Sequence, residues 1–361
     1  MKHFGQRLLS LLLVLCVVTA LFAGLTTVSA KNTLTRGTVC NSLSTKAKAY
    51  YTGDYTYSNM STLQGGTPDK TTGKVSSLAT TNTAMYKRLQ TLMSSTMTNK
   101  VSYKSLTTYW PTTDNNILFY SNAKSSSYNR EHVWPKSRAS FYQANGGSDL
   151  HHLRPTDSTI NSTRSNSTMG NVKDEISGCS TKDYNGTTVL WYSTGRDLVE
   201  VADYVKGDVA RILLYVYVRW GQPNLFETVS SSNLPPFDSD DDKNNGVKVI
   251  ESLDTLLEWC EIDPVDTWEM ARNDEVQNIQ HNRNVFIDYP EYAWLLFGQD
   301  IPTDMTTPSG EAKNATPACT HTNVEQQSKA ATCTEAGYDR TVCKDCGKVL
   351  TNTVKSALGH N

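Results

Sequence analysis

Two segments carry a clear helical pattern of apolar positions. The first is "KGDVARILLYVYVRW" (206–220), whose apolar residues recur three and four positions apart and share one helical face. We predict that it forms a central core helix. The second is "NTAMYKRLQTLMSS" (82–95), which has the same spacing. The defining positions are Val209, Ile212, Leu213, Val216 and Trp220 in the first segment, and Met85, Leu89 and Leu92 in the second.

Later segments predict two more helices, "SLDTLLEWCEI" (252–262) and "VDTWEMARNDEVQNIQ" (265–280). They are separated at Asp263-Pro264, because a proline cannot continue a helix from the preceding turn. Earlier in the chain, "NNILFYSNA" (115–123) is predicted to be a strand that leads toward a histidine-bearing motif.

The N-terminal thirty residues have the order of a secretory signal peptide. Lys2 and Arg7 precede the apolar run "LLSLLLVLCVVTALFA", and small residues end the segment at Ala30. The run is short for a membrane span, so an uncleaved anchor is the weaker alternative. No later segment is apolar enough to cross a bilayer. We therefore expect a secreted, soluble mature protein without a membrane span after signal removal.

The rest of the chain divides into three parts by composition. Residues 31–301 are expected to be one globular catalytic domain. Residues 302–318 are rich in Pro, Ser and Thr and are predicted to be a linker. Residues 319–361 form a separate Cys/His-rich module. The predicted fold class is α+β, a mixed helical domain followed by this small C-terminal module.

Charge limits how the protein can meet a polyanion. The 361-residue chain has a formal net charge of -2, and loss of the signal with its two basic residues makes it -4. A mildly acidic protein lacks the overall basic surface typical of nucleic-acid binders. Any phosphate-binding site must therefore be local, built from a few Arg and Lys side chains or from a metal.

The candidate chemistry lies in "YNREHVWPKS" (128–137) and "DLHHLRPTDSTINSTRSN" (149–166). The first stretch reads as a strand carrying Glu131 and His132. Neighbouring strand residues point to opposite faces, so both can serve one site only where the strand ends, and Pro135 favours an ending there. In the second stretch a short helix is expected after Pro155, with Thr156 or Asp157 as its cap.

That helix would carry Asn161 and Arg164 on one face, because residues three apart are neighbours on a helix. A carboxylate, an imidazole, an amide oxygen and a guanidinium would then meet in one cleft. A hard cation such as Mg²⁺ takes carboxylate and amide oxygens, and a neutral histidine can deprotonate an attacking water. An arginine can grip a phosphate with two hydrogen bonds. These groups suit hydrolysis of a phosphodiester.

Four motifs in order resemble the bacterial endonuclease I family: "NREHVWPKS", "SDLHHLRPTDSTINSTRSN", "VKGDVARILLYVYVRW" and "RNDEVQNIQHNRNVFIDYPEYAWLL". The resemblance implies a ββα-metal (His-Me finger) core. It implies that His132 is the general base and that Glu131 and Asn161 hold one Mg²⁺. It also implies an arginine on the scissile phosphate, for which Arg154 and Arg164 are the candidates.

Several neighbouring residues could have either a structural or a functional role. One of His151 and His152 is expected to pack or hydrogen-bond within the finger and to orient the site, with direct metal binding by either as the alternative. Arg283 could either contact DNA or brace the cleft. The acidic stretch "DSDDDKNNGVKVIE" (238–251) has partial calcium-loop spacing, but its glycine is one residue late, so a solvated loop is favoured.

Cysteines are unevenly distributed. Cys40, Cys179 and Cys260 are scattered through the body and could supply one disulfide. The C-terminal module has spacing compatible with a tetrahedral Zn²⁺ site, and two disulfides are the competing arrangement. We expect this module to serve attachment, for example to a cell surface, and not catalysis. Its candidate zinc ligands are Cys319, His321, Cys333, Cys343, Cys346 and His360.

These observations predict a secreted, Mg²⁺-dependent, non-specific endonuclease. Its substrate would be DNA, with RNA as a second substrate, and its products would carry 5′-phosphate ends. The alternative is a catalytically weak protein that uses a nuclease-like domain to bind DNA or a surface. The presence of Glu131, His132 and Asn161 together favours the enzyme.

Overall fold

The computed structural model describes residues 36–63, 83–139, 146–222, 225, 248–314, 322–334, 337–344, 349–356 and 358–359. The expected signal peptide and residues 238–247 of the acidic stretch lie outside this part of the chain. Among the helices of the described residues, none combines the length and the apolar character that a bilayer crossing requires.

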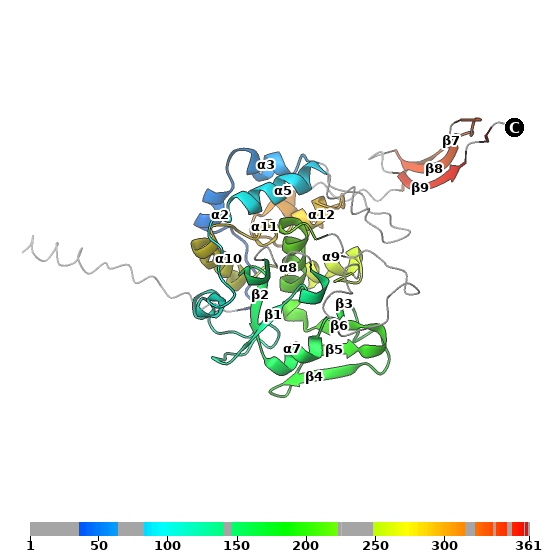
Figure 1. Ribbon diagram of the computed structural model, residues 1–361. Coiled ribbons are helices and arrows are strands. Elements are labelled where there is room, and N and C mark those ends of the chain that lie inside the picture. Colours follow the sequence, from blue (N-terminus) through cyan, green and yellow to red (C-terminus); the bar gives the residue numbers. More distant parts are fainter. Residues whose placement is uncertain are drawn as a thin grey trace, which may run out of the picture. The chain divides into compact units, whose positions relative to one another are not determined.

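The described chain mixes helices with small sheets (Figure 1), so the predicted α+β class is confirmed. The α-helices are α2 (Thr45–Tyr50), α3 (Tyr57–Met60), α5 (Ala84–Ser95), α6 (Trp110–Thr113), α7 (Ser158–Arg164), α8 (Lys206–Arg219), α9 (Leu253–Ile262), α10 (Thr267–Gln280), α11 (Val285–Asp288) and α12 (Tyr292–Leu295). The strands are β1 (Asn129–His132), β2 (Leu153–Thr156), β3 (Thr168–Met169), β4 (Ser180–Tyr184), β5 (Thr187–Ser193), β6 (Leu198–Val201), β7 (Val324–Lys329), β8 (Gly337–Cys343) and β9 (Val349–Lys355). Short 3₁₀ turns span Gly53–Tyr55, Leu106–Thr108, Lys136–Arg138, Gly146–Ser148, Thr194–Arg196, Asp203–Val205 and Glu311–Asn314.

Helix α8 is the predicted core helix. Every residue of it from Lys206 to Val218 is buried, including three charged side chains. Burying a charge is costly unless it is paired. Each of the three has a partner: Lys206 Nζ lies 2.7 Å from Glu200, Asp208 lies 3.1 Å from the Arg36 guanidinium, and Arg211 donates to Glu269.

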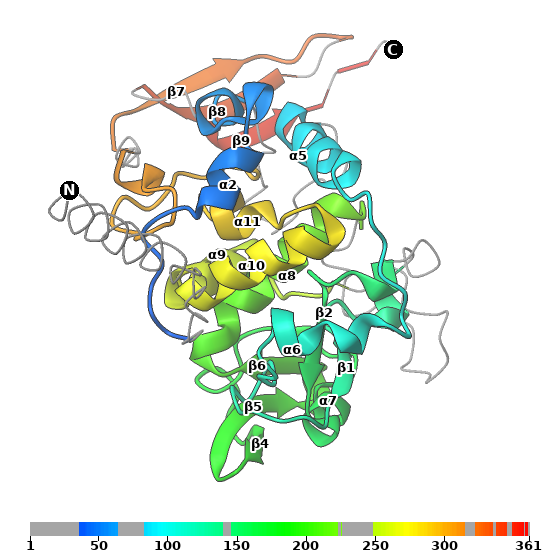
Figure 2. The ribbon, with the colours of Figure 1, turned by 90° about the vertical axis from the view of Figure 1, so that its left-hand side faces the viewer.

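Three neighbouring helices form where the apolar spacing predicts them, namely α5, α9 and α10. Each begins at a side chain that accepts a hydrogen bond from a backbone N–H of the first turn, which is left unsatisfied by the helix itself. Thr83 caps α5 and Ser252 caps α9, while Asp266 and Glu269 form a reciprocal capping box on α10. The Arg211–Glu269 ion pair connects α8 with α10, and both helices lie in the middle of the body in Figure 2.

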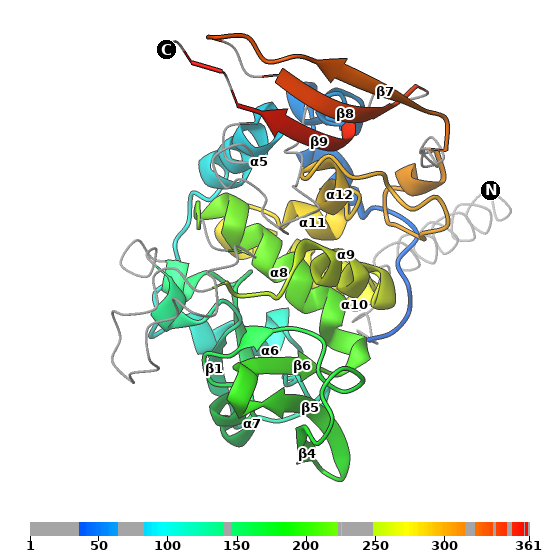
Figure 3. The ribbon, with the colours of Figure 1, turned by 90° about the vertical axis from the view of Figure 1, so that its right-hand side faces the viewer.

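A four-stranded sheet has the order β3-β6-β5-β4. Strands β4 and β5 form a hairpin whose two-residue turn is Asn185-Gly186, both in the left-handed region at φ 50° and 80°. This is the turn geometry that matches the twist of a hairpin. In Figures 2 and 3 this sheet and α7 lie at one end of the body, and α2 and α5 lie at the other.

The strand predicted over 115–123 is wrong. Asn115, Asn116 and Asn122 have positive φ angles of 49°, 57° and 52°, which interrupt an extended chain. The four residues of 117–120 are all buried, so they do not alternate as strand residues do. The segment forms a compact turn, and its one ladder contact is an isolated bridge between Ile117 and Lys124.

Residues 302–314, predicted as linker, pack against the body instead. Met305 and Ala312 are buried in the main core cluster. The buried carboxylate of Glu291 accepts hydrogen bonds from the Thr307 and Ser309 hydroxyls and from the Ala312 N–H. Because these contacts involve both core side chains and a buried charge, the globular unit extends at least to Asn314.

The C-terminal module contains a three-stranded antiparallel sheet in the order β7-β8-β9. Cys343 is buried at the end of β8, and the thiol of Cys333 is exposed. The other four candidate zinc ligands, Cys319, His321, Cys346 and His360, lie outside the described residues. In the body, the described cysteines Cys40, Cys179 and Cys260 are free thiols.

Candidate active site

The two quoted motifs meet in one small unit, a hairpin followed by a helix. Strand β1 pairs antiparallel with β2, so that Glu131 lies opposite Arg154 and His132 opposite Leu153. Helix α7 follows directly. The Asp157 side chain caps it by accepting hydrogen bonds from two backbone N–H groups of the first turn. The predicted strand, helix and cap are therefore all present.

Glu131 is buried on the inner face of β1, with 2% of its surface exposed. Its Oε1 atom accepts a hydrogen bond from the Tyr120 hydroxyl at 2.6 Å and lies 3.3 Å from Nε of Arg164. Burial raises the pKa of Glu131 above its ordinary value, and the Arg164 charge and the Tyr120 hydrogen bond oppose that rise. The two partners hold one oxygen of the carboxylate in a fixed position.

His132 ends β1 and is half-buried. Its ring stacks against Tyr103 at a centroid distance of 6.1 Å and meets the His152 ring edge-on at 5.9 Å. Burial lowers the pKa of His132 to about 3, and the positive charges of His152, Lys136, Arg164 and Arg130 act in the same direction. The imidazole is therefore neutral at neutral pH, which is the state that can accept a proton.

Asn161 and Arg164 connect α7 to β1. The Asn161 amide nitrogen donates to the Arg130 carbonyl at 3.3 Å, and the Arg164 guanidinium donates to the Val133 carbonyl at 2.6 Å. Arg164 is 1% exposed and also binds Ser165 O and the Glu131 carboxylate. The structure thus brings Glu131, Asn161 and Arg164 together, and it uses Arg164 to fix the strand end.

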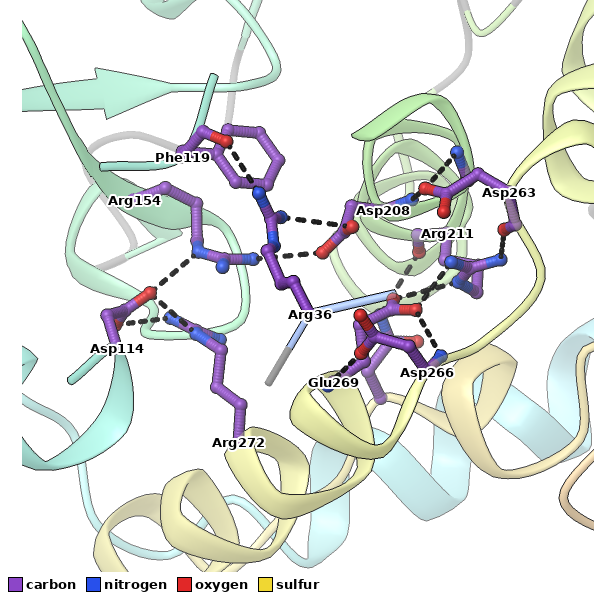
Figure 4. A network of polar contacts seen from close by, with 12 residues as sticks. Arg36, Asp114, Phe119, Arg154, Asp208, Arg211, Asp263, Asp266, Glu269 and Arg272 are labelled. Carbon is purple, nitrogen blue, oxygen red and sulfur yellow. Dashed lines mark hydrogen bonds and ion pairs between the residues drawn. The ribbon is translucent and has the colours of Figure 1, made fainter. Parts of the chain in front are cut away.

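Arg154, the second arginine candidate, belongs to a buried ionic network (Figure 4). Its Nε donates to Asp114 at 3.0 Å, and its guanidinium lies 3.9 Å from Asp208. It also lies over the Phe119 ring, 4.3 Å from the centroid. Burial, together with the charge of Arg272, lowers the pKa of Arg154 to about 9, so it stays a cation at neutral pH.

The same network continues to the N-terminus of α8. Asp263 lies there, and its carboxylate accepts hydrogen bonds from the Gly207 and Asp208 N–H groups. Burial and the Asp208 charge raise the pKa of Asp263 to about 7, although Arg211 and Arg36 act in the opposite direction (Figure 4). Ion pairs and hydrogen bonds therefore connect buried charged residues of separate segments with Arg154 of the hairpin.

His151 and His152 are both buried, whereas the sequence predicts packing for one of them. His152 Nε2 accepts a hydrogen bond from the Trp134 N–H at 3.0 Å, beside the end of β1. His151 Nε2 lies 3.2 Å from the Asn282 carbonyl, and burial lowers the pKa of this histidine to about 4. His152 thus contacts the chain just after β1, and His151 contacts the segment that follows α10.

The surroundings of Arg283 favour a structural role over contact with DNA. The side chain is fully buried and forms ion pairs with Asp274 and Asp288. It lies too deep to reach a polyanion outside the protein.

Sequence reasoning missed Tyr120. This residue belongs to the segment taken for a strand, eleven positions before Glu131, and no spacing rule connects the two. A buried tyrosine normally finds a hydrogen-bond partner, and here the partner is the candidate carboxylate. Among the described residues, no group of three or more His, Cys, Asp or Glu side chains is arranged as a metal site.

The β1–β2 hairpin and α7 carry a carboxylate, a neutral imidazole and an amide, which are side chains expected of a hydrolase, on an α+β protein. Residues 38–291 match the family described as Endonuclease I, and the chain belongs to the endonuclease I family.

Two relatives are both named extracellular ribonuclease. The protein from Bacillus amyloliquefaciens is 39% identical over 196 residues, which is 51% of this chain and 62% of that protein. The protein from Bacillus subtilis (strain 168) is 38% identical over 192 residues, which is 50% of this chain and 60% of that protein. The match covers less than two thirds of either relative's length.

Proposed function

We propose that this protein is a secreted nuclease that hydrolyses phosphodiester bonds in DNA and RNA. The observation that carries the proposal is that Glu131 and His132 end β1 while Asn161 of α7 hydrogen-bonds to the same strand. Membership of the endonuclease I family supports nuclease chemistry. The names of the two relatives support RNA as a substrate and an extracellular location. The signal-like N-terminus agrees with export.

The side chains at this point fit a hard cation. Tyr120 and Arg164 both engage Oε1 of Glu131, and no described residue hydrogen-bonds to Oε2. The Asn161 amide nitrogen donates to the Arg130 carbonyl, which leaves the amide oxygen free to act as a metal ligand. We propose that these two oxygens hold one Mg²⁺, which when bound would stabilise negative charge on the phosphate and the leaving oxygen.

In the proposed reaction His132 takes the proton of the attacking water. A base of very low pKa is weak, but a phosphate dianion or diester beside the ring would favour the imidazolium and raise its pKa toward neutrality. Tyr120 and Arg164 favour the ionised form of Glu131 against the cost of its burial, and they orient the carboxylate. In this scheme the β1–β2 hairpin and α7 act as a ββα-metal core, and cleavage leaves 5′-phosphate ends.

We propose that an arginine contacts the scissile phosphate, and Arg164 and Arg154 are the two candidates. Arg164 stays a candidate through its position beside Glu131. Arg154 stays one only if substrate binding detaches it from Asp114, and its burial makes it the weaker candidate.

The direct test is digestion by the purified full-length protein. Plasmid DNA and a structured RNA are each incubated with Mg²⁺ or with EDTA. Cleavage of both in Mg²⁺ and of neither in EDTA supports the proposal, and end-labelling then identifies the 5′ phosphate. Failure to cut either substrate in Mg²⁺ or Mn²⁺ would favour a binding protein. Calorimetric titration with Mg²⁺ should show about one site per chain, weakened in Glu131→Gln and Asn161→Ala.

For the C-terminal module we propose a structural Zn²⁺, with two disulfides as the competing arrangement, and a role in attachment to a cell surface. A sheet this short buries little apolar surface, so a cross-link would contribute much of its stability. Metal analysis of the full-length protein should find about one Zn²⁺ per chain, removed by a chelator. Loss of the module's fold with reductant alone would instead indicate disulfides.

A further inference from the structure

The buried turn at 117–120 connects the candidate site with other parts of the body. Its last residue, Tyr120, donates its hydroxyl to Oε1 of Glu131 at 2.6 Å. A side chain holds a ligand group in one position only where its own backbone is held in turn. The hydrogen bonds made by the backbone of this turn therefore bear on the position of the Glu131 carboxylate.

One of these bonds attaches the turn to the hairpin of the site. The Phe119 N–H donates to the Pro155 carbonyl of β2 at 2.7 Å. Pro155 lies opposite Arg130 of β1, one position before Glu131. The turn is thereby fixed to the strand pair through a backbone donor, while the carbonyls of Phe119 and Tyr120 accept hydrogen bonds from elsewhere.

Both carbonyls are linked to the N-terminal end of α8. Tyr204, in the short 3₁₀ turn that leads directly into α8, donates its hydroxyl to the Tyr120 carbonyl at 2.8 Å. Arg36 donates to the Phe119 carbonyl at 2.9 Å and lies 3.1 Å from Asp208 in the first turn of α8 (Figure 4). Two side chains from separate segments thus hold consecutive carbonyls of the turn against one end of the central helix.

Of these two contacts, the one made by Tyr204 can be removed with less disturbance. The residue is half-buried, and Tyr204→Phe keeps the ring and leaves no buried charge without a partner. Loss of Arg36 would instead break the ion pair of a buried carboxylate, which is costly.

We propose that Tyr204 is a positioning residue for the Glu131 carboxylate. Its hydroxyl holds the backbone of Tyr120, and the hydroxyl of Tyr120 holds the carboxylate. The proposal rests on the nuclease function proposed above, in which Glu131 binds Mg²⁺, and it assigns the N-terminal end of α8 a part in Mg²⁺ affinity. Tyr204 itself touches neither the metal ligand nor the reacting groups in this scheme.

Calorimetric titration of the full-length protein with Mg²⁺ tests the first consequence. Loss of one hydrogen bond that acts through a supporting residue should raise the Mg²⁺ dissociation constant of Tyr204→Phe about two- to tenfold. The matched control is Tyr86→Phe. That hydroxyl donates to the Tyr217 carbonyl at 2.9 Å, near the other end of α8, so its loss removes the same type of bond without touching the turn. It should bind Mg²⁺ as the parent does.

A double variant distinguishes positioning through Tyr120 from a general structural role. If Tyr204 acts only by way of the Tyr120 hydroxyl, the two substitutions are not additive. Tyr204→Phe should then weaken Mg²⁺ binding in the parent and have no further effect in Tyr120→Phe. A merely structural contribution would weaken binding by the same factor in both backgrounds. Tyr204→Leu repeats the comparison should Tyr204→Phe melt at a lower temperature than Tyr86→Phe.

A second readout needs no metal. With ¹³C at the tyrosine ring carbon that bears the hydroxyl, the Tyr120 resonance in EDTA is identified by its loss in Tyr120→Phe. It should move in Tyr204→Phe and in Glu131→Gln, and it should stay in place in Tyr86→Phe.

The inference is overturned if Tyr204→Phe leaves the Tyr120 resonance or the Mg²⁺ dissociation constant unchanged, or if it weakens binding equally in both backgrounds. A parent that cuts nucleic acid while Tyr204→Phe is unaltered retains the nuclease proposal and loses the positioning role. A parent that neither binds Mg²⁺ nor cuts, but whose Tyr120 resonance moves as expected, retains the positioning of Glu131 and loses the nuclease.

Discussion

At the scale of single residues, local chemistry was predictable and its supporting contacts were not. Glu131 and His132 end β1 and Asn161 lies on α7, because a strand, a hairpin and a capped helix follow one another in a short stretch of sequence. Their partners come from elsewhere: Tyr120 reaches Glu131 from a preceding turn, and Arg154 is taken up by Asp114, forty positions away. Spacing along the chain shows which side chains could serve a site. It does not show which of them are already held by buried partners from other segments.

Tyr120 provides a test of how the Glu131 carboxylate is held. Tyr120→Phe removes the hydroxyl that donates to Oε1 and leaves the ring in place. Residues that support a metal ligand typically contribute about 10–100-fold in affinity or activity. We expect the variant to need about tenfold more Mg²⁺ for half-maximal cleavage. Tyr128→Phe is the matched control, because that hydroxyl bonds to the Thr107 carbonyl. Equal Mg²⁺ titration curves for the parent, Tyr120→Phe and Tyr128→Phe would show that the Tyr120 hydroxyl does not contribute to Mg²⁺ binding.

At the scale of elements, helical periodicity predicted α5, α8, α9 and α10 within about two residues of their ends. Their apolar faces are continuous, so local spacing and tertiary packing agree. The strand predicted over 115–123 failed because apolar content alone does not distinguish a strand from a buried turn, whereas its asparagines favour left-handed backbone. The Asn-Gly dipeptide at 185–186 is itself a strong sequence signal for a two-residue hairpin turn.

Asp263 makes the N-terminus of α8 sensitive to pH. Its pKa is raised to about 7 in the folded protein from an ordinary value of 3.8. The folded state therefore keeps a proton that the unfolded state has released. This contribution to stability is fully present below about pH 4 and is lost as pH rises through about 7.

Asp263→Asn should remove this dependence, because the amide is neutral at every pH and its oxygen can still accept from Gly207 N–H. The unfolding free energy of the variant relative to the parent should rise between pH 4 and 7, by at most about 1.4 kcal/mol per pH unit. Denaturant melts across this range measure it. Asp254→Asn, at an exposed carboxyl in the first turn of α9, is the control and should follow the parent. A constant difference between Asp263→Asn and the parent would contradict the shifted pKa.

At the scale of the whole molecule, the body is joined by charges that lie far apart in sequence. Arg36 near the start of the described chain pairs with Asp208 of α8, and Asp114 joins Arg154 to Arg272 of α10 (Figure 4). No periodicity predicts such pairs. The predicted end of the body at residue 301 is wrong because long-range packing is likewise not visible in local composition. A polar, Pro-rich composition suggested a linker, yet a few residues of 302–314 complete the core.

Two truncated chains test whether the globular body ends before residue 302 or extends to Asn314. A chain ending at Gln299 loses Met305 and Ala312 from the core and leaves the Glu291 carboxylate buried without its hydroxyl donors. We expect a loss of about 3 kcal/mol or more in unfolding free energy. A chain ending at Asn314 keeps these contacts. It should melt like the body of the full-length protein and cut nucleic acid at a similar rate, while losing any binding to cells. Equal stability of the two truncated chains would restore the linker interpretation.

The most direct test of the proposed nuclease is the cleavage rate of His132→Ala in Mg²⁺. General-base catalysis is typically worth about 10²–10⁴-fold, so cleavage of plasmid DNA and of RNA should fall by that factor. The thermal melt and oligonucleotide binding should show that the variant is folded. His281→Asn is the matched control. That histidine ends α10 with a left-handed φ of 72°, which asparagine tolerates. Parent-like cleavage by purified His132→Ala, with His281→Asn also unchanged, would contradict the role of His132 and with it the proposed site.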